Sequence, residues 1–87
     1  MKRKADAGTT TRPFFVRAEW DAEACVWVAT SDDVPGLATE AASLEKLTAK
    51  LKVMIPELIA LNRTATRRRV IAFEVLSRSV ETVRLAG

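Results

Sequence analysis

The sequence predicts an α+β fold with the order β-β-β-α-β, in which one helix packs on a three-stranded antiparallel sheet and one or two further strands follow. Three observations predict it. Two segments near the start, 14–20 and 24–30, are rich in aromatic and β-branched residues. A long stripe of Leu, Ile and Met between residues 44 and 61 has helical spacing. A second β-rich segment, 70–76, comes after the helix.

The first two strands are expected to form a hairpin around the gap DAEA, residues 21–24. This loop would place Trp20 opposite Cys25 and Ala18 opposite Trp27, which gives one wholly apolar sheet face. Cys25 and Trp27 are therefore expected in the core.

The other face of this hairpin is mixed, because apolar side chains alternate there with Arg17 and Glu19. Such a face is more apolar than a lone monomer usually exposes. We expect either the C-terminal strand region or another subunit to cover it.

The segment SDDVPG, residues 31–36, predicts a tight corner. Pro35 suits the second position of a type II turn, and Gly36 supplies the positive φ that the third position requires. Residues 37–41 then form a short third strand.

The helix is expected to begin after Ser43, a good N-cap, with Glu45 in its first turn. Pro56 removes a backbone donor and disfavours helical geometry before it, which predicts a kink or a short second helix. We expect the helical region to end near Asn62.

The C-terminal part begins with RTATRRR, residues 63–69, a basic linker, and continues into the strand at 70–76. Residues 80–86 alternate weakly and are either a fifth strand or a continuation. We treat residues 1–13 as a disordered basic tail and 14–87 as a single domain.

The net charge of +3 is unevenly distributed. Residues 14–62 carry four basic and eight acidic side chains, while both ends of the chain are basic. An acidic body suits a basic protein partner, and basic ends suit phosphate. A less favoured nucleic-acid contact would use Arg67, Arg68 and Arg69.

The composition argues against an enzyme. The chain has no His and one Cys, which removes the usual triads, most zinc sites and an internal disulfide. The hairpin acids and those of the corner would lie roughly 20 Å apart by strand rise, so they cannot share one site. We expect no catalytic residue, metal or cofactor. Without a signal peptide or membrane-spanning run, we expect a cytoplasmic protein with no membrane contact.

We expect partner binding instead. A small core favours a homo-oligomer, either a dimer or a tetramer. An aromatic residue at a strand end and an acidic corner would face a partner. The candidate partner-binding residues are Trp20, Asp32, Asp33, Pro35, Gly36 and Glu40.

The hairpin, the Pro-Gly corner and the leucine-striped helix with Pro56 near its end resemble the N-terminal domain of HicB-like antitoxins. The matching motif residues are Asp33, Val34, Pro35, Gly36, Thr39, Leu44 and Glu45. The likeness covers about residues 14–76 and is strongest to a short HicB-like subfamily of unassigned function.

This resemblance implies a partly degenerate ribonuclease-H-like fold and a type II antitoxin. Such an antitoxin self-associates and sequesters a small basic ribonuclease toxin that resembles double-stranded-RNA-binding domains. HicB proteins often carry a C-terminal DNA-binding module, but the residues after 76 leave no room for one. We therefore expect no such module here. The alternative to an antitoxin is an orphan module of this kind that self-associates without a toxin partner.

Overall fold

The computed structural model describes residues 13–62 and 70–86. It contains β2 (Phe14–Asp21), β3 (Val26–Thr30), β4 (Ala38–Ala41), α1 (Leu44–Leu61) and β5 (Phe73–Arg78). The predicted α+β class and the β-β-β-α-β order are confirmed. The tail at 1–12 and the basic linker at 63–69 lie outside the described residues.

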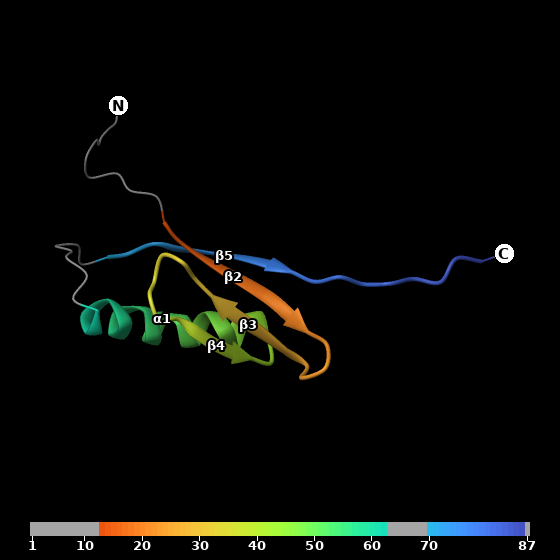
Figure 1. Ribbon diagram of the computed structural model, residues 1–87, viewed down its shortest axis with the longest axis horizontal. Coiled ribbons are helices and arrows are strands. Elements are labelled where there is room, and N and C mark those ends of the chain that lie inside the picture. Colours follow the sequence, from red (N-terminus) through yellow and green to blue (C-terminus); the bar gives the residue numbers. More distant parts are fainter. Residues whose placement is uncertain (1–12, 63–69, 87) are drawn as a thin grey trace, which may run out of the picture.

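The strands form one mixed sheet in the order β4-β3-β2-β5 (Figure 1). The first three strands pair antiparallel, as predicted. β5 returns after the helix and pairs parallel with β2, placing Phe73 beside Phe14 and Val75 beside Val16. The chain needs the helix as a crossover to reach this parallel position.

The hairpin register differs from the prediction. Trp20 lies opposite Trp27, and Ala18 opposite Ala29. The four-residue loop moves by one position, from 21–24 to 22–25, because Asp21 pairs with Val26 while its side chain accepts hydrogen bonds from the backbone N–H groups of Glu23 and Ala24, each at 3.1 Å. The partner positions thus shift by two residues, and each strand keeps its predicted faces.

Cys25 is exposed, so its predicted core position is wrong. Its backbone has φ of 58°, and its N–H donates to the carbonyl of Asp21 at 2.7 Å. This left-handed residue closes the loop, and β3 begins only at Val26. Trp27 is half-buried and packs against the core rather than lying inside it.

The predicted type II corner is confirmed. The N–H of Leu37 donates to the carbonyl of Val34 at 3.1 Å, and Gly36 has φ of 86°. Val34 and Leu37 are both buried, so the turn is anchored on either side of Pro35 and Gly36. β4 starts one residue later than predicted, at Ala38.

α1 is a single helix with Pro56 inside it, so the alternative of a second short helix is wrong. Ser43 caps its start by accepting a hydrogen bond from the N–H of Lys46 at 3.1 Å. The helix ends at Leu61, as expected. The buried residues Ile55 and Ile59 lie on either side of Pro56, and both hold the same helix face against the sheet.

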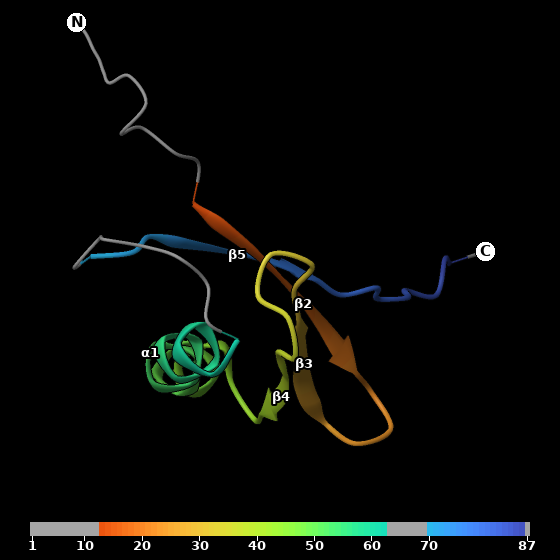
Figure 2. The ribbon, with the colours of Figure 1, turned by 60° about the vertical axis from the view of Figure 1, so that its left-hand side comes forward.

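α1 covers one face of the sheet and packs on β3 and β4 (Figure 2). This face contributes Val16, Ala18 and Ala29 to the core, and α1 contributes the residues of its buried stripe. Small alanines on the sheet allow the larger helix side chains to approach. Beside them, Phe73 and Val75 of β5 are only partly buried.

The described C-terminal residues, 70–86, do not cover the opposite, mixed face of the sheet, because β5 pairs with β2 within the sheet itself. β5 joins the sheet at its edge and therefore widens this face. We call it the open face; by the strand register it comprises Phe15, Arg17, Glu19, Asp21, Val26, Val28, Thr30, Ala38, Glu40, Glu74, Leu76 and Arg78. Another subunit remains the expected cover.

The C-terminal strand spans Phe73–Arg78 rather than 70–76. Residues 79–86 are described but take no strand, so the fifth strand is not formed in the single chain. This segment, which we call the arm, is exposed along its length and runs away from the body of the molecule (Figure 1).

Candidate functional site

The acidic corner is fastened to the start of β2 by the side chains of Ser31 and Asp33. Ser31 Oγ donates to the carbonyl of Phe15 at 2.6 Å and accepts from the N–H groups of Asp33 and Val34 at 3.0 and 3.2 Å. Asp33 Oδ2 in turn accepts from the N–H of Phe15 at 2.7 Å. Beyond Thr30, where β3 ends, the side chains of Ser31 and Asp33 therefore take the place of backbone hydrogen bonds from β3 to Phe15.

The same corner is also tied to the end of α1. Asn62 Nδ2 donates to the carbonyls of Pro35 and Leu58, each at 2.9 Å. A helix C-cap thus holds the Pro-Gly turn from the other side. Asp32 is exposed on this fixed loop, so the loop would lose little entropy if a partner contacted its carboxylate.

The structure brings four of the six predicted partner-binding residues together. Asp32, Asp33, Pro35 and Gly36 all lie in the corner, although Asp33 is partly buried and engaged with Phe15. Glu40 lies on β4 opposite Val28, on the open face.

Trp20 does not join this group. It lies at the far end of β2, roughly 17 Å along the strand from Phe15 by the rise per residue. By the pairing with Trp27, it faces the side of the sheet that carries α1.

The open face adds an apolar area next to the corner. Phe15, whose backbone holds the corner, also places its ring on this face, with the Arg17 guanidinium 5.7 Å from the ring centroid. Val28 is half-buried and Leu76 is 54% exposed. The alternation of apolar and polar residues predicted this face. Its position next to the corner was not predictable, because the two are connected by the hydrogen bond between Phe15 and Asp33, which are 18 positions apart.

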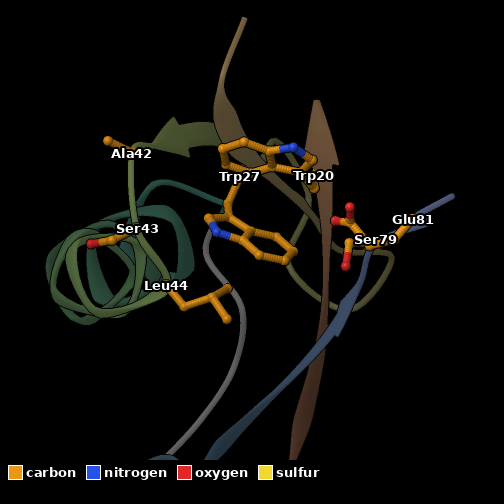
Figure 3. A pocket seen from close by; sticks show the side chains of 7 residues that line it. All are labelled: Trp20, Trp27, Ala42, Ser43, Leu44, Ser79 and Glu81. Carbon is orange, nitrogen blue, oxygen red and sulfur yellow. The ribbon is translucent and has the colours of Figure 1, made fainter. Parts of the chain in front are cut away.

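A tryptophan pocket of about 420 Å³ lies at the other end of the sheet (Figure 3). The rings of Trp20 and Trp27 meet there, with centroids 5.3 Å apart and planes tilted by 59°. Ser79 and Glu81 at the root of the arm form the opposite wall. The predicted register hid this pair, since it placed Trp20 against Cys25.

A second hollow, of about 560 Å³, lies between α1 and the edge strand β4. Lys50 lines it and donates through Nζ to the carbonyl of Glu40 at 2.6 Å. The hollow is lined by Thr39, Lys46, Ala49, Lys50, Val53 and Met54.

Across residues 13–62 and 70–86, no three His, Cys, Asp or Glu side chains come together in a way that could hold a metal ion. No helix in the described part of the chain is long and apolar enough to cross a membrane. The proposed nucleic-acid residues Arg67, Arg68 and Arg69 lie outside the described residues.

Comparison with known proteins places the chain in a family. The family model for a domain of unknown function, DUF1902, matches residues 13–86. The chain belongs to this family. It is also similar to the crystal structure of hypothetical protein TTHA1013 from the extremely thermophilic bacterium Thermus thermophilus, with 50% identity and a TM-score of 0.64 over 85% of this chain and 100% of that one. No curated protein matches the chain.

Proposed function

We propose that this DUF1902 protein is a protein-binding module of the HicB-like antitoxin type, which binds a small basic ribonuclease and blocks it. The observation that carries the proposal is the corner, an exposed acidic loop fixed at both ends to the fold. Its exposed carboxylate is Asp32, and the adjoining open face offers Phe15 and Val28 as apolar contacts.

Charge supports a basic partner. Residues 14–62, which contain the corner and most of the sheet, carry eight acidic and four basic side chains. The acids Asp32 and Glu40 lie on or beside the proposed surface, so they would speed association with a positively charged protein. The apolar residues of the open face would then supply most of the binding energy.

The test begins with the tagged full chain, captured from its own cytosol, and the mass of the eluted complex. A small basic protein should co-elute at stoichiometric amount. When it is separated from the chain, it should cleave RNA, and adding the chain back should stop the cleavage. A co-eluting protein without nuclease activity, or the chain eluting without a partner, contradicts the proposal.

The corner is tested by Asp32→Lys, with Glu23→Lys as the matched control. Both changes replace an exposed acid by a base, but Glu23 lies in the hairpin loop at the other end of β2. Asp32→Lys should weaken nuclease binding about tenfold and reduce its salt dependence, because one steering charge becomes repulsive. Equal affinities for the two variants would remove the corner from the binding surface.

A further inference from the structure

β5 is an edge strand that continues into the arm. It is the last strand in the order β4-β3-β2-β5, and its outer side has no partner strand in the described part of the chain. Edge strands of this kind are templates for pairing with another chain. The arm prolongs the template in an extended path beyond Arg78 (Figure 1).

The arm carries apolar side chains that the single chain leaves in water. Val80, Val83 and Leu85 are 72%, 83% and 86% exposed. On the helix side of the sheet, Phe73 and Val75 of β5 are only partly buried, because α1 packs on the distant strands β3 and β4. The described residues thus include a partly covered apolar strip on β5 and, in the arm, apolar side chains that no other part of the described chain buries.

We propose that β5 and the arm of one chain pair antiparallel with β5 and the arm of a second copy, about a two-fold axis at Ser79. The two four-stranded sheets would then become one continuous sheet. This inference concerns assembly alone and does not depend on toxin binding.

The register follows from symmetry and charge. A two-fold axis perpendicular to the sheet leaves each residue on its own face. Because directly opposite residues share a face and faces alternate along the strand, such an axis must pass through a position where one residue lies opposite its own copy. With Ser79 in that position, Glu74 lies opposite Arg84. Phe73 then lies opposite Leu85, and Val75 opposite Val83.

The neighbouring registers are worse. An axis at Arg78 places two arginines against each other, and an axis at Glu81 places two glutamates against each other. An axis at Ser77 or Val80 leaves Glu74 and Arg84 without opposite charges. Among these registers, only the one centred on Ser79 pairs Glu74 with Arg84, and it also pairs Phe73 with Leu85 and Val75 with Val83. The remaining positions place Leu76 opposite Thr82, Ser77 opposite Glu81 and Arg78 opposite Val80.

This pairing also completes the core side of β5. Continued alternation beyond Ser77 places Val83 and Leu85 on the face that carries Phe73 and Val75. The arm of the second copy would therefore extend the apolar layer across the part of the sheet that α1 does not reach. It would also provide hydrogen-bond partners for the backbone N–H and C=O groups on the outer edge of β5.

The first experiment measures the mass of the full chain by sedimentation across a range of concentrations. The wild type should be a dimer. Glu74→Arg and Arg84→Glu, each alone, should raise the dimer dissociation constant about tenfold or more, since each turns two attractive pairs into repulsive ones. The double variant should restore the dimer, and Glu57→Arg on the exposed side of α1 should leave it unchanged.

A monomeric wild type overturns the proposal, and so does a double variant no stronger than either single one. Circular dichroism of each variant separates lost pairing from lost folding, because a folded monomer retains its strand and helix signal.

A cross-link tests the register itself. In a Cys25→Ser background, Ser79→Cys should form an intermolecular disulfide under mild oxidation, because the two sulfurs meet at the axis. Thr82→Cys in the same background should not, since the two copies of residue 82 would lie roughly 20 Å apart along the strands. Cross-linking through residue 82 but not 79 would refute the pairing.

Discussion

The backbone N–H of Phe15 donates a hydrogen bond of 2.7 Å to Asp33 Oδ2, although the two residues are 18 positions apart. In the ladder with β3, the last paired residue of β2 is Arg17. Asp33 therefore supplies the acceptor that a longer β3 would have provided. The acid at the corner is a structural element of the sheet as well as a candidate contact for a partner.

Asp33→Ala should lower the free energy of unfolding by about 1–3 kcal/mol, because it leaves the partly buried N–H of Phe15 without its acceptor. Urea denaturation of the purified chain measures the change. Asp32→Ala is the control, since Asp32 is exposed and should change stability by less than about 0.5 kcal/mol. Equal losses in the two variants would contradict this role for Asp33.

Gly36→Val should lower the free energy of unfolding by about 1–3 kcal/mol, because it forces a φ of 86° on a β-branched residue. Space is not the obstacle, since a Cβ at this position would lie 3.5 Å from Leu58 Cδ2, an ordinary contact. Thermal and urea unfolding both report the change.

Gly36→Asn is the matched variant for this test, because Asn tolerates left-handed backbone better than Val. It should lose clearly less stability than Gly36→Val. If both variants lose the same amount, crowding rather than the turn conformation would set the cost.

The Pro-Gly corner could be predicted because its signal is local. Pro35 and Gly36 restrict their own backbone angles, so the turn follows from two neighbouring residues. The N-cap at Ser43 was predictable for the same reason. The attachment of the corner to Phe15 through Ser31 and Asp33 was not, since it joins segments that only the folded sheet brings together.

At the edge of the sheet, too, the local structure was predictable and the long-range pairing was not. The β-rich composition near residue 73 predicted a strand, but its parallel place beside β2 depends on the crossover through α1. The weak alternation of residues 80–86 likewise indicated a possible strand in the arm. Whether such a segment pairs depends on a neighbouring strand, which the described residues of one chain do not provide.

The hairpin loop shows how a side chain can override an apolar pattern. The run ACVWV predicted a strand through Cys25, but the carboxylate of Asp21 accepts hydrogen bonds from two loop N–H groups, and the four-residue loop lies one position later than predicted. Cys25 then takes the left-handed position that glycine usually fills. The Trp20 and Trp27 pair, and with it the tryptophan pocket, is a consequence of this two-residue shift.

Cys25→Gly should therefore raise the free energy of unfolding by about 0.5–1 kcal/mol, because glycine adopts a φ of 58° without the clash of a Cβ. The side chain lost is exposed, so little packing is lost with it. Urea denaturation in a reducing buffer measures the gain. Ala24→Gly, one position earlier in the same loop, should lower stability, since the structure shows no positive φ there and glycine only adds freedom to the unfolded chain. A loss of stability in Cys25→Gly equal to that of Ala24→Gly would mean that the left-handed residue carries no strain.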